Sequence, residues 1–508
     1  MSSTPPLARV RHALVGSVVL CLLAACGSTV QMHGSALADG GQSGLGPSTG
    51  SGATSATQGG TSGTGSLSGR GSSGTVSGSA PASAASAGSV SGGSAGALSA
   101  PQAGKATLAP VRLGFTIVPD AAAFASAFGM QSSTGDQAKE VNAAVSWVNS
   151  HGGLNGHPIQ PFVEQVSATS SETYDSQYQA LCSKYTQDDH VVAATILPII
   201  TDPVLDICMS RAKTLLITGS NWLHDPSDFR AAPYAVAPSE PTLSSVTRAL
   251  TRMVLDRSIV TRGGRLGLIS YDVPQYNHAI DTYLKPLLSQ SDVALTQYTI
   301  PRPASYGDIG GSISSVESAT LKMKAQGIKT VMFICPGCAA VFAIYAKSQN
   351  YYPRYVLSSL DPMVLASDKS VFGTAVGIGW EPIVDQDTWS RPKSFADNPT
   401  YNLCLAIEKK SGQVTNDSSL QAAIPLCEGV MDFYVAAKAN PTATITADSL
   451  RAGLLSLGTR HPSALNLATS LSPGYPAGAA GYRFVNYSDS VGTLAYTRDP
   501  MALFEHLP

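Results

Sequence analysis

The stretch "VSWVNSHGGLNGHPIQ", residues 145–160, decides the fold class of this chain. It begins as a helix, because four apolar residues recur with helical spacing: Val141, Ala144, Val145 and Val148. Thr134, with Gln137 three residues later, predicts a capping box at the start of this helix.

Several turn signals follow the helix within a few residues. Gly152 or Gly153 can adopt the left-handed conformation that ends a helix, and Leu154 can pack back on its last turn. Asn155-Gly156 predicts a second turn, after which "HPIQPFVEQV" continues as a strand. A helix that turns directly into a strand indicates an α/β protein.

Strand-like and helical segments alternate along most of the remaining chain. The expected strands are 111–119, 157–166, 191–197, 214–220, 233–239, 265–271, 293–300, 330–336 and 354–360. This alternation is typical of βαβ units with parallel sheets, and the series restarts near Ser239. We therefore expect two doubly wound lobes, a strand-like crossing segment at 374–383, helices near Leu403 and Met431, and a hairpin in 480–498.

The N-terminus has the features of an export signal. Arg9 and Arg11 precede the apolar run "ALVGSVVLCLLAAC", which is too short for a comfortable membrane span. Its end, Leu23 to Cys26, resembles the lipobox of bacterial lipoproteins. The resemblance implies a signal peptide over 1–25 and a diacylglyceryl group on Cys26, which suffices for stable anchoring. An ordinary cleaved signal peptide or an uncleaved anchor are the alternatives.

Residues 26–109 consist mainly of Gly, Ser, Ala and Thr and lack aromatic residues. Such a segment cannot bury enough apolar surface to fold, so we expect a disordered tether. A flexible coil of about 80 residues has an r.m.s. reach of roughly 50 Å. The remaining part of the chain is long enough for two compact domains.

Charge and cysteine content narrow the function further. The net charge is −2 and the pI is about 6.5, so the chain has no electrostatic footprint for nucleic acid. Of eight cysteines, Cys21 lies in the expected signal peptide and Cys26 is the residue that the lipobox resemblance implies is lipidated. The other six are an even set that favours disulfides in an exported protein: Cys182, Cys208, Cys335, Cys338, Cys404 and Cys427. Sequence order suggests the pairs 182–208, 335–338 and 404–427, but spacing leaves the connectivity open. We expect no metal site and no cofactor.

The opening stretch, at a helix-to-strand corner after the first strand, resembles type I periplasmic binding proteins, especially the branched-chain amino-acid-binding family of ABC transporters. Three further segments resemble this family in order and spacing: "PDAAAFASAFGM", "RLGLISYDVPQYNHAIDTYLKPLL" and "SATLKMKAQGIKTVMFI". The resemblance implies two lobes, 110–238 with 382–485 and 239–381 with 486–508. It also implies a three-strand hinge and a ligand held between the lobes.

The resemblance also implies where the ligand is bound. Thr218, Ser220 and Asn221 match the stretch that holds an amino-acid carboxylate in relatives, although Ser220 is equally suited to cap a helix. Trp222 is either a wall of the site or a packing residue.

Three residues of the second half complete the expected site. Tyr276 matches an aromatic ligand contact of the family. Asp361 matches an acid that pairs with the ligand's ammonium group, or else is a turn residue before Pro362. Glu381, beside Trp380 at the crossing segment, is either a ligand contact or a hinge-packing residue.

Two departures from the family bear on the ligand. Leu197 to Ile200 replaces a loop that commonly offers a serine, and Cys427-Glu428-Gly429 replaces Tyr-Asp-Ala. Both changes argue against an ordinary α-amino acid and favour a less polar or differently shaped solute.

The expected function is a non-enzymatic, extracytoplasmic solute-binding protein, anchored to the outer face of the cell membrane. It acts as a monomer with an ABC permease and ATPase as partners. A ligand sensor or a cell-envelope scaffold on the same fold is an alternative. A thiol-disulfide oxidoreductase is another, because Cys335-Pro336-Gly337-Cys338 follows a strand and opens a helix, where thiol pKa values are lowered.

Overall fold

The computed structural model describes residues 106–507, apart from 197–202, 220–222, 363–364, 387–390, 392, 415 and 417. These residues all belong to the unit Ser94–Pro508. The expected signal peptide, Cys26 and nearly all of the tether lie outside the described residues. In the part that the structure describes, no helix is long and apolar enough to cross a membrane.

The first sheet is parallel, with the strand order β2-β1-β3-β4-β5. Its strands are β1 (Val111–Ile117), β2 (Ile159–Gln165), β3 (Ala193–Ile196), β4 (Leu215–Thr218) and β5 (Ala235–Val236). Every residue of β3 and β4 is buried, because helices cover both faces of a parallel sheet.

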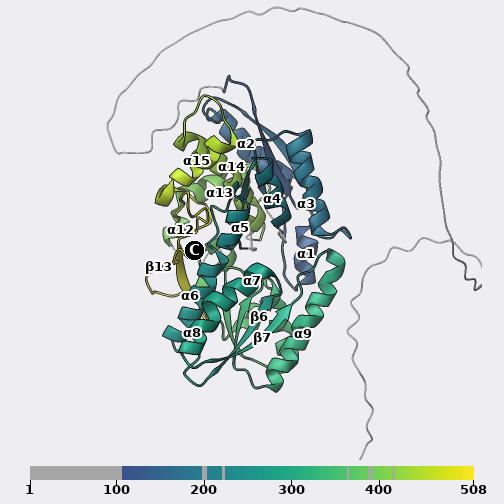
Figure 1. Ribbon diagram of the computed structural model, residues 1–508, viewed down its shortest axis with the longest axis vertical. Helices are drawn as coiled ribbons and strands as arrows, with labels where there is room; N and C mark the ends of the chain where they lie inside the picture. The colour runs from purple at the N-terminus through teal and green to yellow at the C-terminus, as the bar shows by residue number, and fades with distance from the viewer. Residues whose placement is uncertain are drawn as a thin grey trace, which may run out of the picture. The chain divides into compact units, whose positions relative to one another are not determined.

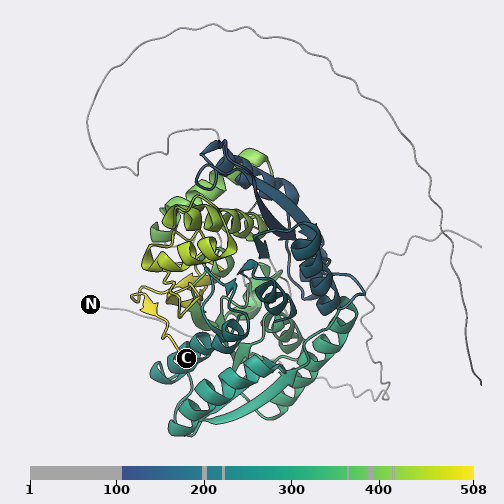
Figure 2. The same ribbon diagram turned by 45° about the horizontal axis from the view of Figure 1, so that its top comes forward.

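Helices from both halves of the chain cover this sheet (Figures 1 and 2). From the N-terminal half come α1 (Ala121–Ala127), α2 (Gln137–Ser150), α3 (Tyr174–Ser183), α4 (Pro203–Arg211) and α5 (Pro226–Ala231). From the C-terminal half come α11 (Pro382–Asp385), α12 (Lys393–Ala396), α13 (Pro399–Ser411), α14 (Leu420–Ala439) and α15 (Ala447–Ser456). Helix α14 packs against α2, α13 and α15, so the late helices complete the core of the first lobe.

The corner between α2 and β2 follows the sequence prediction closely. Gly152 and Gly153 have φ values of 89° and 59°, Leu154 is fully buried, and Gly156 turns the chain again with φ 95°. The predicted capping box is wrong. Asp136 caps α2 by accepting a hydrogen bond from the Lys139 N–H.

Gln137 has a different role from the one in a capping box. Its side chain accepts a hydrogen bond from the Val118 N–H at 2.6 Å and donates one to the Val118 carbonyl at 3.0 Å. It thus ties the first turn of α2 to the end of β1.

The second sheet has the strand order β12-β11-β10-β9-β8-β6-β7, and β13 pairs with β11. Its parallel strands are β6 (Arg265–Tyr271), β7 (Ala294–Ile300), β8 (Thr330–Ile334), β9 (Arg354–Ser358) and β10 (Val376–Gly379). Its antiparallel strands are β11 (Gly481–Ser488), β12 (Thr493–Tyr496) and β13 (Ala502–Leu503). The hairpin expected in 480–498 is β11 with β12. Since β11 begins at Gly481, the chain enters this sheet before residue 486, where sequence reasoning placed the lobe boundary.

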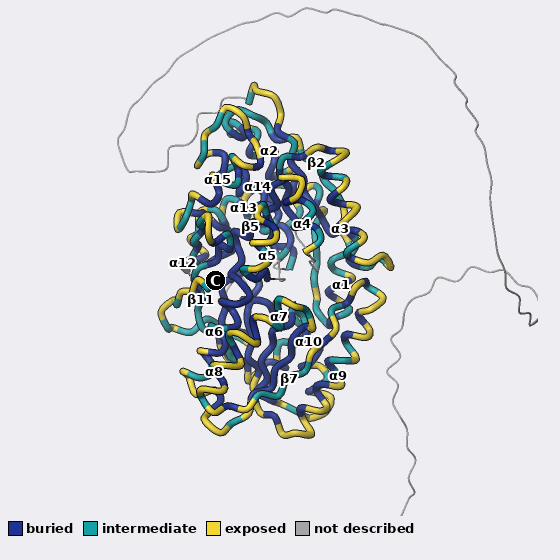
Figure 3. The backbone as a smooth tube through the Cα atoms, viewed as in Figure 1, coloured by how far each residue is buried: buried dark blue, intermediate teal, exposed yellow. Residues whose placement is uncertain are grey.

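The helices of the second lobe are α6 (Leu243–Asp256), α7 (Pro274–Ala279), α8 (Lys285–Gln290), α9 (Ile309–Ala325) and α10 (Cys338–Ser348). A π-helical turn, Ile280–Leu284, connects α7 to α8. Buried backbone runs through both sheets, and exposed residues lie on the outer helices and turns (Figure 3).

Within the described residues, the chain passes between the two sheets at three places: after β5, after β10 and before β11. The first and third passages are hydrogen-bonded to each other, with Ala237 N–H donating to the Pro476 carbonyl and Gly478 N–H donating to the Ala237 carbonyl. A Cβ on Gly478 would lie 1.9 Å from the Pro238 carbonyl oxygen, so only glycine allows this close approach.

The six cysteines of the folded part lie in three bonded pairs, 182–208, 335–338 and 404–427. Cys182 of α3 is joined to Cys208 of α4, and Cys404 of α13 to Cys427 of α14. The pairs therefore connect neighbouring helices of the first lobe, except for 335–338, which lies between β8 and α10.

Candidate functional site

A cavity of about 200 Å³ lies between the two sheets. Its wall forms where strands end: Val118 follows β1, Gly219 follows β4, Tyr271 ends β6, and Pro336 and Pro362 come after β8 and β9. Ligands of open α/β sheets bind outside the carboxyl ends of the strands. Both sheets therefore contribute their ligand-binding edges to one cavity.

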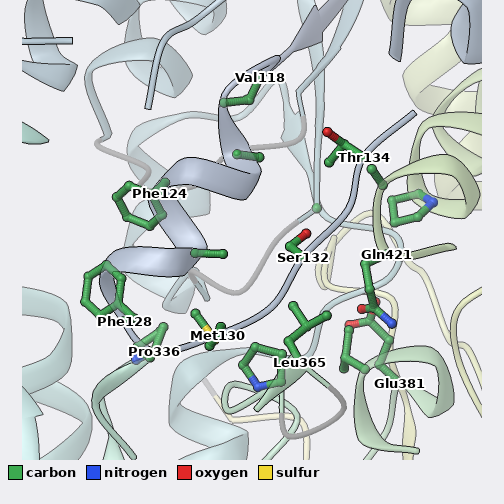
Figure 4. Close-up of a pocket in the computed structure, with 18 of the residues that line it drawn as sticks. Val118, Phe124, Phe128, Met130, Ser132, Thr134, Pro336, Leu365, Glu381 and Gln421 are labelled. Atoms are coloured by element: carbon green, nitrogen blue, oxygen red, sulfur yellow. The ribbon is translucent and has the colours of Figure 1, made fainter. Parts of the chain in front are cut away.

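The cavity has an apolar end and a polar end (Figure 4). Phe124 and Phe128 lie on one side of it, whereas Glu381 and Gln421 lie on the other. Sites of this kind bind the apolar body of a solute and orient its polar group.

Helix α1 supplies the aromatic end. It starts directly after β1 and places the rings of Phe124 and Phe128 with centroids 5.2 Å apart. Pro336 lies beside Phe128 (Figure 4), its carbonyl accepts a hydrogen bond from the Tyr271 hydroxyl at 3.2 Å, and Tyr276 packs edge-on against the Tyr271 ring. These contacts hold the aromatic wall in place.

Glu381 is an acid at the polar end, between β10 and α11. Its backbone N–H donates to the Ser359 hydroxyl at 3.4 Å and to Asp385 Oδ2 at 3.2 Å. No hydrogen bond or ion pair joins its carboxyl group to another described residue. Burial, and then the neighbouring carboxyl groups of Asp385, Glu240 and Glu428, raise the pKa of Glu381 well above its ordinary value.

Asp385 supports Glu381 from α11. Burial raises the pKa of Asp385 to about 7, although the Tyr496 hydroxyl donates a hydrogen bond to its Oδ2 at 2.5 Å. A Cβ on Gly379 would lie 2.3 Å from the same oxygen. Glycine at the end of β10 thus allows the aspartate to reach back to the Glu381 backbone.

Glu240 also lines the cavity, but it has a cationic partner. Its Oε2 lies 3.6 Å from Nδ1 of His224, whose Nε2 lies 2.9 Å from Asp206 Oδ2. Burial opposes the charged form of His224, but the two carboxyl groups outweigh burial and raise its pKa well above the ordinary value. The charge of Glu240 is therefore compensated inside the protein.

Glu428 lies behind the cavity in a complete hydrogen-bond network. One oxygen accepts from the hydroxyls of Ser239 and Ser463, and the other accepts from the Ala464 N–H at 2.7 Å. Asp432 and His461 are hydrogen-bonded to each other beside it.

Among the described residues, Glu428, Asp432 and His461 offer ligand atoms within 4.8 Å of one another, a spacing that could hold a metal ion. The hydrogen bonds of Glu428 and the contact between Asp432 and His461 already occupy most of these atoms. The group is therefore a network that fixes α14 to the lobe crossing.

A second set of contacts joins the lobes beside Met130 and Leu365, and we call it the cleft bridge. It comprises residues 129–131 and 365–367: Met130 pairs with Ala366, Gln131 N–H donates to the Leu365 carbonyl at 2.7 Å, and the Ser367 hydroxyl donates to the Gly129 carbonyl at 3.0 Å. The cleft bridge lies next to the cavity, because Met130 and Leu365 line the cavity.

Of the expected site residues that the structure describes, one lines the cavity and three are buried beside it. Glu381 lines the cavity. Thr218 is fully buried and faces a neighbouring pocket of about 30 Å³. Tyr276 and Asp361 are buried next to the wall, where Tyr271 and Pro362 contact the cavity instead. Ser220, Asn221 and Trp222 lie outside the described residues.

Asp361 is nevertheless an unusual buried acid. Its Oδ2 accepts a hydrogen bond from the Ser358 N–H at 3.3 Å, whereas Oδ1 has no partner among the described residues. Burial raises the pKa of Asp361 well above its ordinary value. Burial behind Pro362 therefore favours the protonated, neutral form of the Asp361 carboxyl group.

Sequence reasoning missed Phe124, Phe128 and Glu240 as cavity residues. The two phenylalanines stand four residues apart just after the first strand, a spacing that places both on one face of a helix. Glu240 directly follows Ser239, where the series of strands restarts in the sequence. An acid at this expected boundary between the lobes could have been predicted to face the cavity.

The pair Cys335–Cys338 lies at the edge of the cavity. Pro336 and Gly337 between the cysteines line it, while both cysteines are buried. Gly337 has φ 79°, a conformation that suits glycine in the tight turn before α10.

No protein-family model matches the chain, and no curated protein sequence matches it. Solved structures do. A fatty acid ABC transporter substrate-binding protein from Thermomonospora curvata matches with 14% identity over 76% of this chain and 91% of its own, with a TM-score of 0.54. A branched chain amino acid ABC transporter from Thermus thermophilus with bound valine matches with 13% identity over 77% and 96%, with a TM-score of 0.55.

A third match is an ABC transporter substrate-binding protein from Desulfitobacterium hafniense in complex with Leu, with 14% identity over 76% and 100% of the two chains and a TM-score of 0.51. The chain has the type I periplasmic binding protein fold. The fold class expected from the sequence is confirmed. The cavity of this chain lies between its two sheets, where the resemblance of the sequence predicts the ligand.

Proposed function

We propose that the chain is an extracytoplasmic, lipid-anchored solute-binding protein that captures a small molecule between its lobes and delivers it to an ABC importer. The observation that carries the proposal is the cavity to which the strand ends of both sheets contribute. A ligand in this position contacts both lobes only when they are closed, so its binding energy stabilises the closed form.

The proposed solute is an amino acid or a related polar or amphipathic molecule. The names of the similar structures mention a fatty acid, valine and Leu, which are small molecules with a polar group on an apolar body. The cavity of this chain has the same division, with Phe124 and Phe128 opposite Glu381.

The proposed anchor rests on the sequence of the N-terminus. A lipid on Cys26, followed by a Gly- and Ser-rich tether, would hold the folded unit outside the membrane but within reach of a permease. Mass spectrometry of the protein from membranes tests this part: a diacylglyceryl mass on Cys26 is expected, and an unmodified N-terminus would contradict it.

A thermal-shift screen of amino acids, amides, sugars, amines and small acids tests the binding function. Ligands that bind the native state raise the melting temperature. Ala121→Trp fills the cavity and should abolish the shift, whereas Ala123→Trp on the exposed side of α1 should preserve it. A scaffold protein would show no shift with any compound.

Transport needs a separate measurement. Cells that lack the chain should lose uptake of the labelled solute that the screen identifies, and the unmodified gene should restore it. Binding without any effect on uptake would favour a sensor.

A further inference from the structure

The charged side chains among the described residues that line the cavity are both acids. Glu240 and Glu381 line it, and no Lys or Arg is among its described lining residues. The described lining residues therefore offer acids, amides, hydroxyls and backbone groups, but no basic side chain, to a ligand.

Of the two acids that line the cavity, Glu381 has no ion pair with a described residue. Glu240 faces His224, whereas the charged groups that act on the pKa of Glu381 are the carboxyl groups of Asp385, Glu240 and Glu428, none of which is a cation. Beyond Asp385 lies the Tyr496 hydroxyl, and the charge of Arg483 acts on Tyr496 but is not among the groups that shift the pKa of Glu381. Glu381 is half-buried in the wall of the cavity, so its carboxylate loses part of its hydration without a partner among the described residues. A cationic group within hydrogen-bonding distance offsets that loss.

The other end of the cavity selects for an apolar body of limited size. Phe124, Phe128 and Met130 form this end, and Leu365 is drawn between them and Glu381 (Figure 4). A cavity of about 150 Å³ in another protein accommodates one benzene molecule. The cavity of about 200 Å³ here therefore fits one aromatic ring or a short branched chain with a small arm.

We propose that the ligand is an amphipathic organic cation, a protonated amine on an apolar body of about one aromatic ring and without a carboxylate, and that Glu381 is its counter-ion. The inference rests on the proposed solute-binding function and specifies the class of solute. It adds the ionic contact at the lobe crossing, where closure brings Glu381 against the ligand.

The pH dependence of binding has a sign that separates this ligand from a carboxylic acid. The pKa of Glu381 is raised in the empty site, so an amine that binds to its ionised form releases a proton. Affinity for the amine should therefore increase with pH up to the pKa of Glu381. A carboxylate ligand would need Glu381 to be protonated, and its affinity would decrease as pH rises.

Four compounds of similar size test the proposal by calorimetry on the full chain: 2-phenylethylamine, 2-phenylethanol, 3-phenylpropanoate and phenylalanine. The amine is expected to bind at least tenfold more tightly than the others, and more tightly at pH 8 than at pH 6. Tighter binding of phenylalanine, of 3-phenylpropanoate or of the neutral alcohol would overturn the proposal.

The matched variants are Glu381→Gln and Glu172→Gln, the second on an exposed residue of the first lobe. Glu381→Gln should weaken amine binding about 10- to 100-fold and remove its pH dependence, whereas Glu172→Gln should change neither. If 3-phenylpropanoate binds well and the amine does not, the solute-binding function stands and the cationic ligand is refuted. If none of the four compounds binds, the proposal is refuted, and the thermal-shift screen decides the function independently.

Discussion

Two glutamates near the passages between the lobes, Glu428 and Glu381, differ in burial and in their hydrogen-bond partners: Glu428 is buried and Glu381 is half-buried. The oxygens of Glu428 accept hydrogen bonds from two hydroxyls and one backbone N–H. The carboxyl group of Glu381 has none from a described residue and lines the cavity. Proteins normally give polar groups that leave water a hydrogen-bond partner, so a half-buried acid in a cavity wall, without a partner among the described residues, suits an external partner. Glu428 stabilises the lobe, and Glu381 is available to a ligand.

The largest effect is expected for Glu428→Ala. It leaves the Ser239 and Ser463 hydroxyls and the Ala464 N–H without their acceptor, so the free energy of unfolding should fall by about 3 kcal/mol. Chemical denaturation of the variant and of the unmodified chain measures the loss. A loss below about 1 kcal/mol would contradict the structural role given to this residue.

A third acid, the buried Glu408, sharpens the comparison, because only one of its carboxyl oxygens has a described hydrogen-bond partner, the Ser411 hydroxyl at 3.4 Å, and the residue is not among those that line the cavity. Glu408 of α13 is fully buried, and its Oε1 has no partner among the described residues. Burial, and then the nearby Glu140, raise the pKa of Glu408 to about 9. The folded state thus keeps a proton that the unfolded state has lost, so the contribution of Glu408 to stability falls as pH rises from about 4.5 to about 9.

Glu408→Gln removes the loss of stability that Glu408 causes at high pH, and the amide has nearly the same size as the carboxyl group. The variant should be more stable than the unmodified chain by on the order of 2 kcal/mol at pH 8, and nearly equal to it at pH 5. Melting temperatures at both pH values check this. Ligand affinity should not change, which distinguishes Glu408 from Glu381.

Glu381→Gln should have a smaller effect on stability than on binding. Without ligand, the variant should gain about 1 kcal/mol at pH 8, because the amide needs no proton to remain neutral. Denaturation without added solute measures the gain. A loss of stability instead would show that Glu381 has an internal partner and is a packing residue of the crossing.

The smallest effect is expected at the cleft bridge. Ser367→Ala removes the hydrogen bond to the Gly129 carbonyl, which is exposed and contributes less than about 1 kcal/mol. Ligand affinity should fall about two- to threefold with little change in melting temperature. Ser370→Ala, which removes a bond only to the nearby Asp368, is the control and should leave affinity unchanged.

Local sequence patterns predicted the elements well where a few neighbouring residues decide the structure. The glycines at 152, 153 and 156 and the buried Leu154 determine the corner after α2, since backbone conformation at positive φ depends on the residue itself. The capping prediction at Thr134 was wrong because Gln137 binds the end of β1, a contact with a residue distant in the sequence.

The candidate site was less accessible to sequence reasoning. Glu381 was among the expected residues, but Phe124, Phe128 and Glu240 were not. Whether Asp361 or its neighbour Pro362 contacts the cavity depends on how β9 ends against the other lobe, which no local pattern contains. Only the packing of the two lobes decides which side chains reach the shared cavity.

The amino-acid sequence alone determined the alternation of strands and helices, the two doubly wound lobes and the absence of a nucleic-acid footprint. These follow from hydrophobic periodicity, turn residues and net charge, which act over short distances or as sums over the chain. The tertiary structure alone decided that Glu428 is satisfied and Glu381 is not, because hydrogen-bond partners at Ser239, Ser463 and Ala464 are brought to one of them by folding. Two identical side chains thus differ through their surroundings, and those surroundings exist only in the folded chain.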